Sequence, residues 1–262
     1  RSVSAFLLNR SSDLLSCIDL PLAEASLLPK EYVKAIVEDD VYRMDGIKRD
    51  TNKMRLLLRS LARNESTTVT NRTLKNDVKE IDDEDIDANT INEYLNIFER
   101  LFLINNQKPF AASVRSSVRI KQAVKRHFVD PSISAALLGV TSSSLLNDLE
   151  TLGLLFEALC ERDLQIYADA FGGSLYHYQD YKNREIDAVV ECPDGEWCAF
   201  EIKLGANQID AAAEGLLRLK AEFEADPRGR PPKVLCVLCG LSNAAYQRPD
   251  GVFVVPLTAL RD

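Results

Sequence analysis

The fold is decided by the stretch Glu185-Ile-Asp-Ala-Val-Val-Glu-Cys-Pro-Asp-Gly-Glu-Trp-Cys-Ala-Phe-Glu-Ile-Lys203. Side chains alternate between the two faces of a strand, and Pro193-Asp-Gly195 fits a three-residue hairpin loop that ends on a left-handed glycine. The stretch therefore predicts two antiparallel strands. In the register that this loop imposes, Asp187 of the first strand lies opposite Glu201 of the second.

The second strand carries Glu201 and Lys203 on one face and the apolar Phe200 and Ile202 on the other. Two carboxylates opposite each other repel unless a cation lies between them, and Mg²⁺ binds one or two carboxylates while keeping several waters. Acid-x-lysine alone also fits a solvated hairpin with ordinary surface charges. The apolar second face predicts a strand in the middle of a sheet, where charged residues need a reason, and this favours a metal-competent site.

Asp187 followed by Glu201-Ile-Lys203 resembles the PD-(D/E)xK motif of restriction-endonuclease-like nucleases. The resemblance implies that Asp187, Glu201 and the carbonyl group of Ile202 hold Mg²⁺ or Mn²⁺. It also implies that Lys203 assists the attack of a water on a phosphodiester. Such nucleases often add an acid from a helix before the sheet, which implies Glu157 as a further catalytic residue and metal ligand.

From about residue 30 to the end, the chain is similar to the C-terminal portion of a prokaryotic AAA-type ATPase family. In that family a P-loop ATPase is followed by a winged helix and a nuclease-like domain of unknown function. The segments that carry the resemblance are Val41–Asp50, Leu57–Arg63, Glu99–Leu103, Lys125–Ser132 and Ala135–Gly139. The resemblance implies an ATPase domain in the parent protein as a partner. This chain begins at Arg1, which we interpret as the start of a fragment, and it contains no G-x-x-x-x-G-K-[ST], so we expect no ATP site in it.

These patterns predict an α+β or α/β protein in three parts. We expect a linker and lead-in helix at 1–50, a winged helix-turn-helix at 51–126 and a restriction-endonuclease-like α/β domain at 127–262. The expected helices are 29–45, 52–63, 73–78, one from 87 or 89 onward, 131–139, 148–167 and 209–225. The expected strands are 102–104, 107–111 and 118–120 in the wing, then 175–179, 186–192, 197–204, 234–239 and 252–255.

Charge is unevenly shared along the chain. The net charge of −8 divides into +2 over residues 1–126 and −10 over residues 127–262. A nuclease domain that grips long DNA by itself should be basic, so phosphate contacts would have to come from elsewhere. The wing supplies candidates for nucleic-acid binding, which are Arg115, Arg119, Lys121, Lys125 and Arg126.

The segment 77–87 is strongly acidic and precedes the helix that would read DNA. It would repel phosphates, so a protein-docking role for the winged helix is an equal alternative to DNA binding. The basic wing could also be a solvated strand edge. Two functions therefore stay open, namely a metal-dependent nuclease module and a non-catalytic docking or regulatory module of the ATPase.

The remaining sequence features point to no second site. Cys236 and Cys239 lie three residues apart in an expected strand, which directs the two thiols to opposite faces, so we expect neither zinc nor a disulfide. His127 and His177 are expected to be structural, and Gln208 is a weaker polar candidate near the site. Neither a membrane span nor a signal peptide is evident, and the expected compartment is the cytoplasm.

Overall fold

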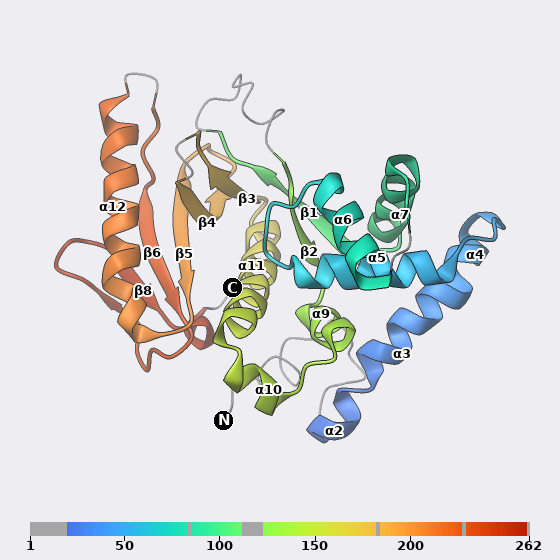
Figure 1. Ribbon diagram of the computed structural model, residues 1–262. Coiled ribbons are helices and arrows are strands. Elements are labelled where there is room, and N and C mark those ends of the chain that lie inside the picture. The colour runs from blue at the N-terminus through green and yellow to red at the C-terminus, as the bar shows by residue number, and fades with distance from the viewer. Residues whose placement is uncertain (1–19, 83–84, 112–122, 182–183, 227–228, 261–262) are drawn as a thin grey trace. The chain divides into compact units, whose positions relative to one another are not determined.

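The computed structural model describes residues 20–82, 85–111, 123–181, 184–226 and 229–260 of the 262-residue chain (Figure 1). They form helices and a mixed sheet, so the protein is α+β. The described residues divide into two compact units. The N-terminal unit holds the residues up to Asn106 and Lys125–Leu159, and the C-terminal unit holds the described parts of Gln107–Val124 and Cys160–Asp262. This division differs from the boundary expected after residue 126, because the segment that follows it packs on the N-terminal helices.

The lead-in helix of the N-terminal unit is continuous but not uniform. A short helix α2 (Leu22–Ala25) precedes α3 (Leu28–Ala35), which passes without a break into the π-helical turn η2 (Ile36–Asp40) and then α4 (Val41–Asp45). Figure 1 shows α3 and α4 as one blue rod. The rod ends at Gly46, whose φ of 72° is a left-handed helix stop that glycine adopts without a steric penalty.

Three further helices surround the apolar core of this unit. They are α5 (Thr51–Arg63), α6 (Asn71–Asp82) and α7 (Ala88–Arg100). Asp50 and Asp87 cap α5 and α7 by accepting hydrogen bonds from main-chain N–H groups of the first turn. The predicted apolar stripes are buried at Met54, Leu57, Leu58 and Leu61 on α5 and at Ile91, Tyr94, Leu95 and Phe98 on α7. Leu101, also predicted for the second stripe, caps the end of α7 and is only partly buried.

The predicted wing differs from the structure. We expected two strands joined at Asn105-Asn106, but one strand, β1 (Ile104–Pro109), runs straight through these residues. Its last residues pair in parallel with strand β3 of the C-terminal unit, described below, through Lys108 and Tyr176, and this long-range pairing outweighs the turn preference of asparagine. The expected strand at 118–120 lies outside the described residues. Strand β2 (Lys125–Phe128) follows in the N-terminal unit.

The N-terminal unit continues with two short helices. As predicted, α9 (Pro131–Leu138) begins after the cap Asp130 and ends at Gly139. Next come α10 (Ser142–Asn147) and the long helix α11 (Leu149–Ala170), whose second half belongs to the C-terminal unit.

The C-terminal unit is built on a mixed sheet. Its strands are β3 (Ser174–Gln179), β4 (Glu185–Glu191), β5 (Trp197–Lys203), β6 (Val234–Cys239), β7 (Tyr246–Gln247) and β8 (Phe253–Val255). Spatial order is β3-β4-β5-β6-β8-β7, with the end of β1 beside β3. The first three form the predicted antiparallel meander, and β6 and β8 then continue parallel to β5. Two single turns, η3 (Ala206–Gln208) and η4 (Leu257–Ala259), complete the unit.

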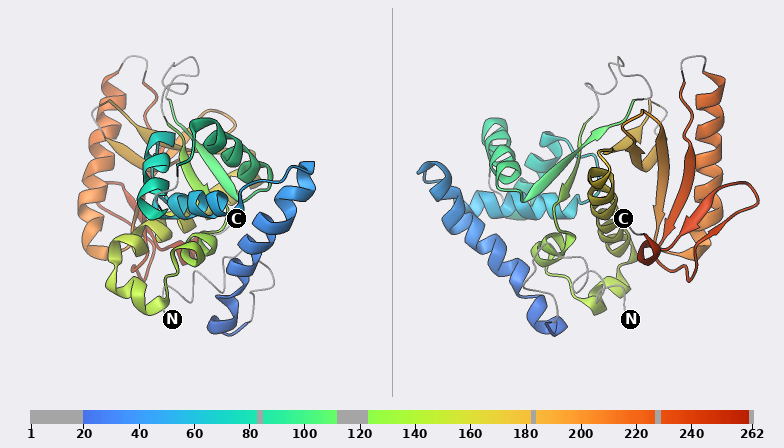
Figure 2. Two further views of the ribbon diagram at one scale, coloured as in Figure 1. Left: turned by 45° about the vertical axis from the view of Figure 1, so that its right-hand side comes forward. Right: turned by 180° about the vertical axis from the view of Figure 1, so that it is seen from behind.

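Helix α12 (Ile209–Ala225) makes the crossover from β5 to β6 and covers one face of the sheet. Both views of Figure 2 show this orange helix running along the strands. Of its predicted inward residues, Ala212, Leu216 and Leu219 are buried against the sheet together with Trp197 of β5, and Phe223 packs against the same cluster but is only partly buried. Strand β5 is therefore central, because β4 and β6 flank it and α12 covers it.

The β4–β5 hairpin has the predicted loop, and Gly195 adopts a φ of 83°. The main-chain ladder runs from Glu191↔Trp197 to Ala188↔Phe200 and stops one pair short of Asp187 and Glu201. At the same place β4 carries a bulge toward β3, since the single residue His177 faces both Asp187 and Ala188. A bulge interrupts the hydrogen-bonded ladder and changes the direction of a side chain. Asp187 is one of the two residues in this bulge.

Candidate functional site

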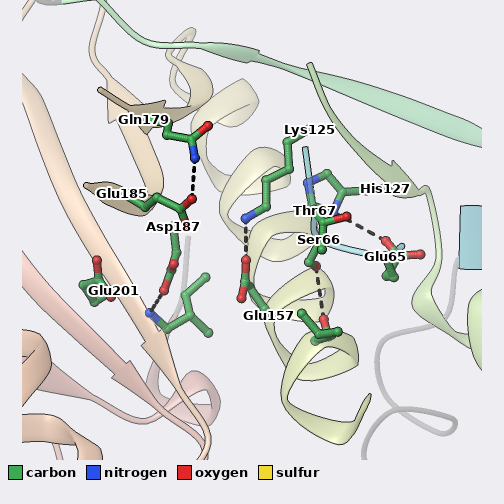
Figure 3. A network of polar contacts seen from close by, with 12 residues as sticks. Glu65, Ser66, Thr67, Lys125, His127, Glu157, Gln179, Glu185, Asp187 and Glu201 are labelled. Carbon is green, nitrogen blue, oxygen red and sulfur yellow. Dashed lines mark hydrogen bonds and ion pairs between the residues drawn. The ribbon is translucent and has the colours of Figure 1, made fainter. Parts of the chain in front are cut away.

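Asp187 is held where the β4–β5 ladder opens. Its Oδ2 atom accepts a hydrogen bond of 2.7 Å from the main-chain N–H of Ile202 and an ion-paired contact of 3.0 Å from Lys203 Nζ. Figure 3 shows the carboxylate joined to that amide by a dashed line. The Ile202 N–H has no main-chain partner on β4 beyond the end of the ladder, and the Asp187 side chain accepts its hydrogen bond instead. This hydrogen bond fixes the orientation of the carboxylate.

Glu201 and Lys203 extend from the end of β5 beside Val237 and Cys239 of β6. Lys203 Nζ lies 2.7 Å from Glu201 Oε2 as well as 3.0 Å from Asp187 Oδ2. The side chains of Asp187, Glu201 and Lys203 are 13%, 14% and 26% exposed. The structure therefore brings the three predicted residues together, partly buried, with the ammonium group between the two carboxylates.

Burial and mutual repulsion shape the charges of this cluster. Desolvation, and after it the charge of Asp187, raises the pKa of the Glu201 carboxyl well above its ordinary value. Burial alone would lower the pKa of Lys203, but the two neighbouring carboxylates outweigh it and raise this pKa instead. A single lysine does not fully compensate two confined carboxylates, so this position favours additional positive charge.

The carboxylate oxygens of Asp187 and Glu201 suit a hard divalent cation, although they provide few protein ligands. Among the residues that the structure describes, no three or more His, Cys, Asp or Glu side chains are grouped for one ion. An ion here would have Asp187 and Glu201 as its side-chain ligands, which matches the one or two carboxylates that Mg²⁺ accepts while it retains water.

Glu157 lies in the N-terminal unit, on the first half of α11. It forms an ion pair with Lys125 of β2, and the two side chains are only 16% and 8% exposed (Figure 3). Its negative charge is thus compensated within its own unit. Its predicted roles as an acid and a metal ligand stay predictions.

The cations predicted to bind nucleic acid have no common surface among the described residues. Arg115, Arg119 and Lys121 lie outside the described residues. Lys125 is buried in its pair with Glu157, and Arg126 donates a hydrogen bond of 2.8 Å to the main-chain oxygen of Val69. Desolvation by burial lowers the pKa of Arg126. Both Lys125 and Arg126 therefore serve the packing of the N-terminal unit.

The weaker candidates have structural contacts. Gln208 accepts a hydrogen bond of 3.1 Å from the Gly205 N–H through its side-chain oxygen and so closes the turn that leads into α12. His177 is buried on β3 opposite the bulge. Cys236 and Cys239 are buried in β6. Among the described residues, no helix combines the length and the apolar composition needed to cross a membrane.

One buried acid was missed by sequence reasoning. Glu65 follows α5 and is 1% exposed; it accepts a hydrogen bond of 3.2 Å from the Phe128 N–H, and its carboxylate oxygen lies 3.5 Å from His127 Nδ1 (Figure 3). It borders a cavity of about 180 Å³ in the N-terminal unit, lined by Ala62, Arg63, Glu65, Leu138, Thr151, Leu154 and Leu155. Glu65 stands in a polar stretch that reads as a surface loop, so the sequence carries no signal of its burial.

Comparison with known families gives two matches. Residues 17–144 match a domain of unknown function, DUF8612, and residues 152–260 match a second one, DUF4143. Each match covers less than half of the chain. The second family is commonly associated with AAA-type ATPases, which agrees with the expected parent protein. No curated protein and no solved structure matched the chain.

Proposed function

We propose that the C-terminal unit is a metal-dependent phosphodiesterase module of the nuclease type. The observation that carries this proposal is the convergence of Asp187, Glu201 and Lys203 where the hydrogen-bonded ladder between β4 and the central strand β5 ends. Replacing a buried ionic cluster by apolar residues is often neutral or stabilising, so folding alone gives little reason to place two acids and a lysine there.

Each residue has a role in this proposal. Asp187 and Glu201 would hold Mg²⁺ or Mn²⁺, with the Ile202 carbonyl group and Glu157 as the further ligands that the PD-(D/E)xK resemblance implies. The bound ion would supply Lewis-acid stabilisation and a more acidic water. The Ile202 N–H keeps the Asp187 carboxylate in one orientation. Lys203 holds a permanent positive charge at the site, where it can neutralise charge that develops on a phosphate.

A second candidate is a non-catalytic docking or regulatory module of an ATPase. Two observations favour it. Residues 127–262 carry a net charge of −10, which repels nucleic acid, and Lys203 contacts both carboxylates and so compensates part of their charge. In this alternative the cluster is a stabilised remnant of a nuclease-like fold.

The proposed partners follow from the family resemblance and from the charge of the two halves of the sequence, 1–126 and 127–262. We propose an ATPase domain of the parent protein as the intramolecular partner. DNA, or a protein instead, would be the ligand of the N-terminal unit if that unit acts as a winged helix. The proposed location is the cytoplasm.

A nicking assay on supercoiled DNA tests the catalytic proposal. We expect strand breaks with Mn²⁺ or Mg²⁺, none with EDTA, and no activity in Asp187→Ala and Lys203→Ala. The matched controls are Glu214→Ala and Lys220→Ala on α12, which should retain activity. Equal residual cleavage by the wild type and both site variants would overturn the proposal.

Metal-dependent thermal stabilisation separates the two candidates without a substrate. A ligand that binds only the folded state raises the melting temperature by mass action. Millimolar Mn²⁺ should therefore raise the melting temperature of the wild type, and Glu201→Ala should abolish the rise. A rise that persists in Glu201→Ala would place the ion elsewhere.

A further inference from the structure

The exposed side of helix α5 carries three arginines at a spacing of four residues, here called the arginine row. Arg55, Arg59 and Arg63 are exposed, whereas the rest of the helix is mostly buried. A spacing of four residues advances about 6 Å along a helix and rotates by about 40°, so the three side chains follow one shallow line. The buried residues of α5 are Met54, Leu56, Leu57, Leu58, Ser60, Leu61 and Ala62.

Within the described residues, these three arginines have few partners. Arg55 pairs with Glu38 of η2 at 2.5 Å, but both side chains are more than 40% exposed, and such surface pairs are weak and easily exchanged. Neither Arg59 nor Arg63 makes an ion pair or side-chain hydrogen bond with another described residue. With respect to the described part of the chain, two guanidinium groups without partners therefore lie one turn apart on a fixed backbone.

This row contrasts with the cations expected from the wing. Lys125 is buried and paired with Glu157, and Arg126 is partly buried and donates a hydrogen bond to the Val69 carbonyl group. The arginines of α5 are thus better placed to contact an external anion than the cations of β2.

We propose that Arg59 and Arg63, with Arg55 at the far end of the row, contact the phosphodiester backbone of a nucleic acid. The choice of a nucleic acid as the polyanion rests on the proposed phosphodiesterase function. Guanidinium groups bind phosphate oxygens in a bidentate manner, and phosphate contacts position a nucleic acid without reading its sequence. Because the core fixes α5, the row needs no folding step before binding.

Fluorescence anisotropy with a labelled duplex of about 20 base pairs tests this surface in the full chain, with EDTA present to prevent cleavage. The variant Arg59→Ala/Arg63→Ala should bind at least tenfold more weakly than the wild type. The slope of log affinity against log salt should fall by about two, since each arginine removed should lower it by about one. The control Arg72→Ala/Lys79→Ala removes the same charge from exposed positions of α6 and should bind within about twofold of the wild type.

Three outcomes overturn the proposal. They are an absence of DNA binding by the wild type at about 50 mM salt, equally weakened binding in the two double variants, and displacement of DNA by polyglutamate as readily as by unlabelled DNA. The last would identify an acidic protein as the better partner. Asp187→Ala should bind DNA like the wild type, so failure of the nuclease proposal stays distinguishable from failure of this one.

Discussion

At the scale of single residues, Glu65 should make folding depend on pH. Burial raises the pKa of its carboxyl group from 4.5 to about 8, although hydrogen bonds from Ser134 and the Phe128 N–H and the charge of Lys125 oppose the shift. The folded chain thus keeps a proton that the unfolded chain loses above pH 4.5. The stabilising contribution is complete below that pH and declines until pH 8, by at most about 1.4 kcal/mol per pH unit.

The variant Glu65→Gln should remove this dependence, because an amide does not titrate and still accepts the Phe128 hydrogen bond. Urea unfolding at pH 5, 6, 7 and 8 measures how the free energy of unfolding depends on pH. The control is Glu80→Gln, at an exposed position. Identical slopes in the wild type and in Glu65→Gln would contradict the assignment.

Lys203→Met should expose the repulsion between Asp187 and Glu201. Removing one partner of a buried ion pair costs about 3–5 kcal/mol, and partial exposure reduces this to about 2 kcal/mol here. Because the carboxylates then lack a cation, Mn²⁺ should raise the melting temperature of Lys203→Met more than that of the wild type. Lys220→Met serves as the control, and an equal or smaller Mn²⁺ effect in Lys203→Met would show that lysine and metal do not share these ligands.

At the scale of elements, the β4–β5 turn controls the site. Gly195 has a φ of 83°, and a Cβ atom there would lie 2.8 Å from Arg230 Nη1. Gly195→Ala should therefore cost about 1–2 kcal/mol and lower the melting temperature. Gly215→Ala on α12 meets nothing within 4 Å and should stabilise by about 0.5–1 kcal/mol. Thermal unfolding measures the melting temperatures of both variants. A higher melting temperature for Gly195→Ala than for Gly215→Ala would refute the role of the turn.

How far the sequence predicts elements depends on whether the signals are local. The hairpin, α9 and α12 are set by Gly195, Asp130 and an apolar stripe, and the structure has each of them close to the expected bounds. Strand β1 was mistaken for two strands because its partner β3 is about 70 residues away, and no local pattern encodes that pairing. The two-residue strand β7 is likewise fixed only by its neighbour β8.

The candidate site follows the same rule. Alternation along β5 predicts that Glu201 and Lys203 share a face, and the turn predicts the approach of Asp187. The bulge opposite His177 and the capture of the Ile202 N–H were not predictable, because both depend on where β3 meets β4. The pairing of Lys125 with Glu157 also escaped prediction, since it joins segments that are 32 residues apart.

At the scale of the whole molecule, the two proposed functions belong to different units. The carboxylate cluster lies in the C-terminal unit and in the second family match, and the arginine row lies in the N-terminal unit and in the first match. Hydrogen–deuterium exchange can separate them, because binding slows exchange where it stabilises local structure. Mn²⁺ should slow exchange in 185–204 and leave 51–63 unchanged, and DNA in EDTA should do the opposite. Equal slowing of both segments by either ligand would show that the two surfaces act as one site.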